Sequence, residues 1–196
     1  MIKTIDLLMY DYRKYSNIYN KIKNEEKKGE IIKVRRGLYE TNANANPLTL
    51  ANIILSPSYI SFETALSYYG MIPERVYAIK SATFNKNKKK EFSNQFGLFL
   101  YSDINKNAFP YDICYVEIEN VKVAIASREK ALLDMISTLS PRDNIKELED
   151  LIFNDLRIDE VIFDELDKNK IIKLCDLYCN KSIKLLKKYL GEKNDK

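Results

Sequence analysis

Apolar residues at helical spacing predict two helices at the start of the chain. The first helix is indicated by Ile2, Ile5, Leu8 and Met9. It is expected to end near residues 10–13. The second is indicated by Ile18, Tyr19 and Ile22, which a polar run follows. Gly29 is expected to end this helix, because glycine readily takes the left-handed conformation favoured just past a helix end.

The next segment, residues 30–39, predicts two short strands joined by a tight turn. Gly37 follows Arg35 and Arg36 and can supply the positive φ that a hairpin turn requires. Two helices followed by a hairpin are typical of a winged helix-turn-helix domain, in which the hairpin is the wing. We therefore expect a DNA-binding domain of this type over residues 1–45. An ordinary solvated basic turn is the alternative interpretation of the hairpin.

Positive charge is concentrated in this part of the chain. Residues 12–36 include nine basic and three acidic residues, a net charge of +6, whereas the whole chain of 196 residues carries +4. A local excess of this kind is typical of a module that binds a polyanion. We expect the second helix to lie in or near the major groove, and the wing to contact phosphates or the minor groove. The expected DNA-binding residues are Ser16, Asn17, Asn20, Lys21, Lys23, Lys33, Arg35 and Arg36.

A polar stretch at residues 41–47 predicts a linker to a second domain over residues 46–196. Helices are expected at 48–55 and 63–69, and strands at 76–83, 97–101, 114–119 and 121–126. The basic run at 85–90 is interpreted as a solvated loop, with a second phosphate contact as the alternative. Ser127 is expected to cap a helix whose acidic residues Glu129 and Asp134 solvate its outer face or meet a partner.

After Pro141 the apolar spacing is helical to the end of the chain. The expected fold class is therefore α+β. It comprises an N-terminal winged helix-turn-helix followed by a mixed α/β domain with a helical C-terminus.

Composition excludes several classes of enzyme. The chain has no histidine, which removes Ser-His-Asp and Cys-His nucleophile systems and the commonest zinc sites. It has no Walker-type phosphate loop and no Gly-x-Gly-x-x-Gly motif. Three cysteines without other marks of secretion indicate reduced thiols in a cytoplasm. We expect a cytoplasmic, non-enzymatic protein with no cofactor, no metal and no membrane partner.

One group of residues leaves an enzymatic alternative open. Glu117, Glu119 and Lys122 fall on two adjoining predicted strands, and carboxylates beside a lysine can hold Mg²⁺ and stabilise developing charge. This pattern allows a metal-dependent DNA-processing enzyme of a mobile element. Alternating charges on the outer face of a hairpin explain the same residues without chemistry, and that interpretation is preferred.

Three blocks carry a family resemblance. They are residues 33–39 (Lys-Val-Arg-Arg-Gly-Leu-Tyr), residues 58–70 (Ser-Tyr-Ile-Ser-Phe-Glu-Thr-Ala-Leu-Ser-Tyr-Tyr-Gly) and residues 125–134 (Ile-Ala-Ser-Arg-Glu-Lys-Ala-Leu-Leu-Asp). In this order they resemble the AbiEi family, the antitoxins of bacterial abortive-infection toxin-antitoxin pairs. The resemblance extends over most of the chain, although the N-terminal module is shorter than the family pattern.

The resemblance implies a transcriptional regulator whose winged helix-turn-helix binds double-stranded DNA at the promoter of its own operon. It implies that the larger C-terminal domain is required for antitoxin action. The implied partner is a cognate nucleotidyltransferase-like toxin, counteracted in the type IV manner without a stable complex. An antitoxin that acts by protein interaction, with a vestigial DNA-binding module, is the alternative.

Overall fold

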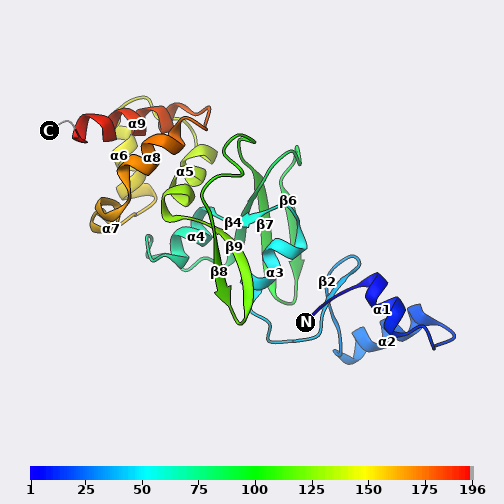
Figure 1. Cartoon of the computed structure of the whole chain (residues 1–196). Helices are drawn as coiled ribbons and strands as arrows, with labels where there is room; N and C mark the ends of the chain where they lie inside the picture. The colour runs from blue at the N-terminus through cyan, green and yellow to red at the C-terminus, as the bar shows by residue number, and fades with distance from the viewer. Residues whose placement is uncertain (195–196) are drawn as a thin grey trace.

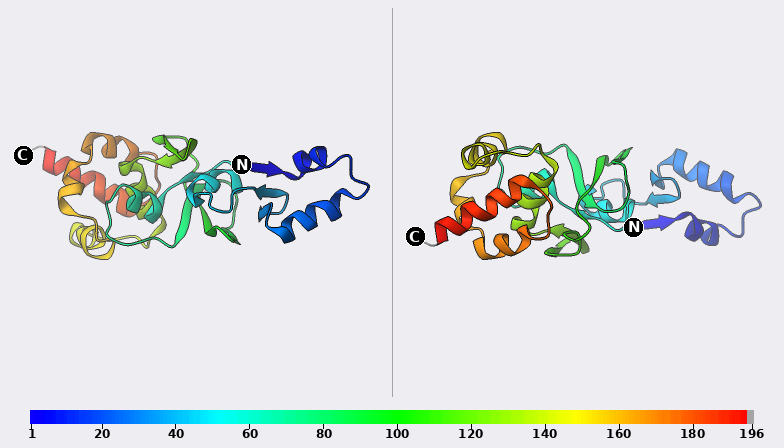
Figure 2. Two further views of the ribbon diagram at one scale, coloured as in Figure 1. Left: turned by 90° about the horizontal axis from the view of Figure 1, so that it is seen from below. Right: turned by 90° about the horizontal axis from the view of Figure 1, so that it is seen from above.

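The computed structural model describes residues 1–194 and shows an α+β chain with two β-sheets (Figure 1). The first sheet belongs to residues 1–45, here called the N-terminal module. Its elements are β1 (Ile2–Thr4), α1 (Ile5–Asp11), α2 (Ile18–Lys28), β2 (Ile32–Arg35) and β3 (Leu38–Glu40). The strands pair antiparallel in the order β1-β3-β2. The two helices extend away from this sheet and form the end of the molecule opposite the C-terminus (Figure 2).

Local capping defines the helices of the N-terminal module. The side chain of Thr4 accepts a hydrogen bond from the Leu7 N–H, so α1 begins at Ile5. The prediction that Ile2 belongs to this helix was wrong, because residues Ile2–Thr4 pair with β3 instead. The end of α2 follows the prediction, since Gly29 caps it with a φ of 75°.

The predicted hairpin is present, with its turn at Arg36 and Gly37. Gly37 has a φ of 76°, the left-handed conformation that glycine adopts without strain. The Gly37 carbonyl accepts a hydrogen bond of 2.9 Å from the Ile5 N–H. The turn therefore lies against the first residue of α1, at the base of the module.

The remaining residues, 46–194, are here called the body, and its sheet has six strands in the order β6-β7-β5-β4-β9-β8. Its pairs β5/β7 and β4/β9 are parallel and the other pairs are antiparallel. The elements as far as β9 are α3 (Pro47–Ile54), β4 (Tyr59–Ile60), α4 (Phe62–Tyr68), β5 (Ala78–Thr83), β6 (Lys90–Asn94), β7 (Gly97–Asp103), β8 (Ile113–Ile118) and β9 (Val121–Ala126).

Strand β6 was not predicted from the sequence. It begins at Lys90, within the basic run interpreted as a loop, and pairs antiparallel with β7. The ring of Phe92 on β6 packs edge-on against the ring of Tyr101 on β7, with centroids 5.8 Å apart. This contact across the sheet stabilises a strand whose own residues are mostly polar.

Helices complete the body at the end opposite the N-terminal module (Figures 1 and 2). They are α5 (Arg128–Thr138), α6 (Ile145–Glu149), the π-helix η1 (Asp150–Asp155), α7 (Glu160–Glu165), α8 (Lys168–Cys175) and α9 (Lys181–Asn194). One large hydrophobic core joins these helices to the sheet. Within residues 1–194, no helix is both long and apolar enough to cross a bilayer.

The hairpin of the N-terminal module packs into this large core. Val34 and Leu38 are 3% and 4% exposed and belong to the same cluster as the apolar residues of the body. The side-chain amide of Asn94 on β6 also donates a hydrogen bond of 2.9 Å to the Val34 carbonyl. The module's separate cluster is small, with Leu8, Ile22, Ile31 and Tyr39 as its buried members. The hairpin therefore depends on the body for the burial of Val34 and Leu38.

The polar stretch expected as a linker is ordered by short-range hydrogen bonds. The Glu40 carboxylate accepts from the N–H groups of Thr41 and Asn42, each at 2.8 Å. Asn46 then caps α3, its side chain accepting from the Leu48 N–H at 3.0 Å. These bonds define the path of the chain from β3 into α3.

Helix α5 begins after Ser127 as predicted, but the expected outward position of its acids was wrong. Glu129 is 6% exposed and Asp134 is fully buried. Asp134 accepts four hydrogen bonds, from the side chains of Tyr59, Ser61, Lys130 and Tyr178. Donors from β4, from α5 and from the segment before α9 converge on one carboxylate, so these elements are held together at this point.

Candidate nucleic-acid interface

The start of α2 lies at the outer end of the N-terminal module. Ser16 is exposed in the loop that precedes the helix. Asn17 is the N-cap, and its side-chain oxygen accepts from the Asn20 N–H at 3.0 Å. The Asn20 side chain is exposed in the first turn. Of the two asparagines expected to read bases, Asn17 already uses its carbonyl oxygen to cap the helix, and Asn20 retains both polar atoms of its amide for a ligand.

The two lysines expected on α2 differ in their surroundings. The Lys21 ammonium donates to the Glu25 carboxylate at 2.6 Å, one helical turn away, and lies 4.9 Å from the centre of the Tyr15 ring. The hydrogen bond to Glu25 raises the pKa of Lys21. Lys23 is exposed. Lys23 is therefore the better placed of the two for a phosphate contact.

The remaining expected residues lie on the hairpin. Lys33 and Arg35 alternate along β2 with the buried Ile32 and Val34, so both basic side chains face solvent. Arg36 is exposed at the turn. The Arg35 guanidinium donates to the carbonyl of Arg36 at 3.4 Å. The hairpin thus presents three cations near the base of the module, and α2 presents a polar first turn at its outer end (Figure 1).

Sequence reasoning missed two exposed tyrosines of this module. Tyr10 and Tyr19 are 63% and 67% exposed, and the guanidinium of Arg13 stacks 4.1 Å from the centre of the Tyr10 ring. Tyrosine hydroxyls commonly bond phosphate oxygens at protein–DNA interfaces. Tyrosine is half apolar, so its position in a helical pattern does not reveal whether it is buried or exposed.

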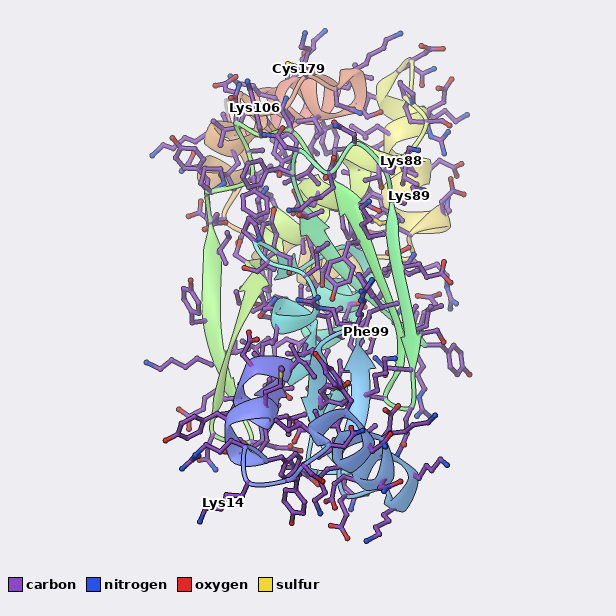
Figure 3. All side chains as sticks on the ribbon, turned by 90° about the vertical axis from the view of Figure 1, so that its right-hand side faces the viewer. Lys14, Lys88, Lys89, Phe99, Lys106 and Cys179 are labelled. Atoms are coloured by element: carbon purple, nitrogen blue, oxygen red, sulfur yellow. The ribbon has the colours of Figure 1, made fainter. Side chains whose placement is uncertain are left out.

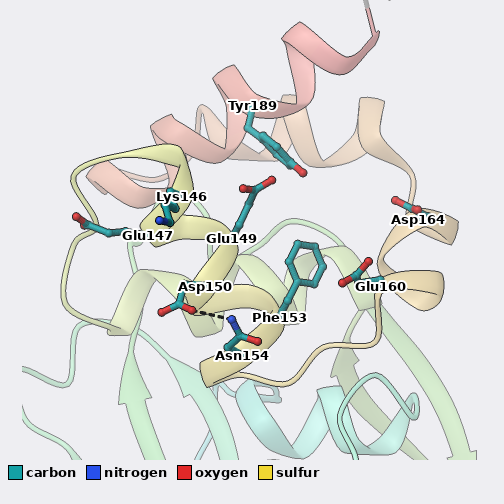
Figure 4. A pocket seen from close by; sticks show the side chains of 9 residues that line it. All are labelled: Lys146, Glu147, Glu149, Asp150, Phe153, Asn154, Glu160, Asp164 and Tyr189. Carbon is teal, nitrogen blue, oxygen red and sulfur yellow. Dashed lines mark hydrogen bonds between the residues drawn. The ribbon is translucent and has the colours of Figure 1, made fainter.

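One segment at the opposite end of the molecule is acidic, although α8 and α9 at the same end are rich in lysine (Figure 1). Residues 141–167 include ten acidic and three basic residues, a net charge of −7. A hollow of about 650 Å³ there is bordered by five carboxylates around Phe153 and Tyr189 (Figure 4). The carboxylates belong to Glu147, Glu149, Asp150, Glu160 and Asp164. The carboxylates around this hollow disfavour anions locally, whereas the exposed cations of the N-terminal module attract them.

The residues of the enzymatic alternative occupy the β8–β9 hairpin. Glu117 and Lys122 are directly opposite each other on the two strands, and both are exposed. Glu119 lies in the turn with a φ of 50°, and its carboxylate accepts from the Asn46 N–H at 3.4 Å. Among residues 1–194, no three acids, cysteines or histidines are grouped closely enough to hold a metal ion. The hairpin therefore brings together one acid and one lysine, with Glu119 bound to the start of α3.

The arrangement of the N-terminal module suits binding, since it presents cations, amides and hydroxyls on an exposed surface. Comparison with known proteins does not assign the chain, because no protein-family model and no curated protein matches it. Function is therefore inferred from the N-terminal module and from the three sequence blocks.

Proposed function

We propose that this chain is a cytoplasmic DNA-binding antitoxin of the AbiEi type that represses its own operon. The observation that carries the DNA-binding part is the concentration of exposed positive charge in the N-terminal module. Exposed basic residues lie on α2 and on the β2–β3 hairpin, and residues 12–36 carry a net charge of +6. The order of two helices and a hairpin supports a winged helix-turn-helix, in which the second helix enters the major groove.

In this proposal each part of the module has its own contact with duplex DNA. The side-chain amide of Asn20 reads a base edge, for which adenine is the suited partner. Arg35 and Arg36 contact phosphates or the minor groove from the hairpin. The connection between α1 and α2 spans residues 12–17, longer than the three or four residues usual in a helix-turn-helix. Leu8 of α1 and Ile22 of α2 belong to one buried cluster, which then keeps the two helices together.

The antitoxin part of the proposal rests on the sequence blocks and on how they pack. Block 58–70 supplies β4 and α4, and block 125–134 supplies the end of β9 and most of α5. The blocks meet at Ile60 and Ile125, which are partners in the β4/β9 pair. They meet again where Tyr59 and Ser61 donate to Asp134. The body would oppose a nucleotidyltransferase-like toxin without forming a stable complex.

The enzymatic alternative has less support, because the Glu119 carboxylate accepts a hydrogen bond from Asn46 at the start of α3. Glu119 also belongs to no group of three potential metal ligands among the described residues. A protein-interaction antitoxin remains the second candidate. It differs from the first in one measurable respect, since it protects from the toxin without binding DNA.

The test is binding of the purified full chain to its own promoter, measured by fluorescence anisotropy over a range of salt concentrations. Arg35→Ala with Arg36→Ala should weaken binding to all DNA sequences and reduce the salt slope by about two units, because each phosphate contact contributes roughly 0.9. Asn20→Ala should instead lose about 1–3 kcal/mol of discrimination between promoter and random DNA. Lys106→Ala is the matched control, because Lys106 is an exposed basic residue on the body.

An unchanged salt slope in the double arginine variant would remove the hairpin from the interface. Equal losses on promoter and random DNA for Asn20→Ala would refute a base-reading role. Protection from the co-expressed toxin by a wild-type chain that binds no DNA would favour the protein-interaction antitoxin.

A further inference from the structure

A groove of about 810 Å³ lies on one face of the body sheet, between strands β5–β7 and helices α4 and α5. Leu100 of β7 is flanked in register by Lys80 of β5 and Glu91 of β6, so these three side chains share the face that the groove covers. Met135 and Leu139, at the end of α5, complete its apolar lining. The volume is within the range of about 300–1,000 Å³ typical of small-molecule sites.

Lysines border this groove from the loop between β5 and β6. Lys88 and Lys89 are exposed, and Lys90 begins β6. Among the described residues these three lysines form no ion pair. Figure 3 shows Lys88 and Lys89 next to each other on the body, at the opposite end of the view from Lys14 of the N-terminal module. The lysines therefore form a cationic rim separate from the proposed DNA interface.

The acids of the groove are mostly engaged. The carboxylate of Asp103 accepts from the backbone N–H groups of Lys86 and Asn87, each at 2.9 Å, and so holds the lysine loop in place. Glu63 is paired with Lys80. Among the described residues that line the groove, Glu91 is the one acid whose carboxylate forms neither an ion pair nor hydrogen bonds to the backbone. The lining has four lysines and three carboxylates, a net charge of +1, and its exposed cations gather at Lys88 and Lys89, which favours an anion at that rim.

We propose that this groove binds a phosphorylated organic molecule of nucleotide size. Its phosphates would lie on Lys88 and Lys89, since the lysine ammonium is a compact charge well suited to phosphate oxygens. Its organic part would pack on Leu100, Met135 and Leu139. Such a ligand matches all three features of the groove: its size, its apolar lining and its cationic rim.

The test is direct binding of ATP, GTP, CTP and UTP to the full chain by isothermal titration calorimetry at constant ionic strength, with inorganic tripolyphosphate as the comparison anion. At least one nucleotide is expected to bind more tightly than tripolyphosphate. Lys88→Ala with Lys89→Ala should weaken that binding at least about tenfold, since it removes two charge-assisted contacts. Lys106→Ala, and the Arg35→Ala, Arg36→Ala double variant, should bind the nucleotide like wild type.

Three results would overturn the proposal. The first is no binding of any of the four nucleotides. The second is equal affinity for tripolyphosphate and every nucleotide, because this would show that anions simply adsorb to surface lysines. The third is a loss in the Lys106→Ala control as large as that in the Lys88, Lys89 variant. Circular dichroism of each variant shows that the fold is retained, and exposed loop positions are expected to tolerate the change.

Discussion

Replacing Asp134 by asparagine tests the buried polar cluster that joins the sheet to the C-terminal helices. The Asp134 carboxylate is fully buried. One of its oxygens accepts from Tyr59 and Ser61, both at 2.8 Å. The other accepts from Lys130 at 2.8 Å and from Tyr178 at 2.6 Å. Asparagine has nearly the same shape, but it removes the charge and turns one acceptor into a donor that faces donors.

The expected loss of unfolding free energy depends on Lys130, whose ammonium is also fully buried. Burial lowers the pKa of Lys130, and the neighbouring Asp134 opposes that effect. Without the carboxylate this ammonium is an uncompensated buried charge, and removing one partner of a buried pair costs about 3–5 kcal/mol. The free energy of unfolding of a natural domain is only about 5–15 kcal/mol, so this is a large fraction of the total.

The assay is urea denaturation at pH 7 followed by far-UV circular dichroism. With a slope of about 1–3 kcal/mol per molar urea, the midpoint of Asp134→Asn should fall by roughly 1–5 M. Asp143→Asn is the matched control, because that carboxylate is 75% exposed and pairs with Lys181 on the surface. It should leave the midpoint unchanged.

A compensated variant separates the charge from the packing. Lys130→Met with Asp134→Leu removes both charges and should recover much of the lost stability, since apolar replacement of a buried ion pair is often close to neutral. A midpoint for Asp134→Asn equal to that of wild type would refute the reasoning. A double variant less stable than Asp134→Asn would show that the hydrogen bonds from Tyr59 and Tyr178, rather than the buried charge, hold the elements together.

Two further predictions concern the packing of the chain. A fragment of residues 46–196 should fold, but with about 3–6 kcal/mol less stability than the full chain, because it loses the buried side chains of Val34 and Leu38 at roughly 1.5–3 kcal/mol each. Residues 1–45 alone should be unfolded by circular dichroism. A cooperative unfolding transition in that fragment would contradict this. Burial raises the pKa of Glu129, but hydrogen bonds from its own backbone, from Lys170 and from the Asp167 N–H outweigh burial and lower it below 4.5. Its contribution to stability is therefore present above pH 4.5 and is lost as the pH falls through the folded pKa; Glu129→Gln should show a smaller loss of urea midpoint between pH 6 and pH 3 than wild type.

Features decided by neighbouring residues could be read from the sequence. Gly29 and Ser127 mark helix ends because caps act within one turn, and both caps are present. Gly37 marks the hairpin turn because it needs a positive φ, and alternation along β2 exposes Lys33 and Arg35. The net charge of residues 12–36 is likewise a property of the sequence. These local signals are sufficient to predict an α+β chain with a basic N-terminal module.

Features that depend on distant partners required the tertiary structure. Residues Ile2–Thr4 follow a helical pattern, yet they form a strand because β3 provides its hydrogen-bonding partner. Asp134 looks like a solvated helix residue, and its burial is possible only because Tyr59 and Ser61, more than 70 positions earlier, donate to it. The groove lined by Lys88 and Lys89 exists because β6 pairs with β7 beside the end of α5. Local propensity cannot specify such contacts, since their free energy comes from surfaces that meet only when the chain folds.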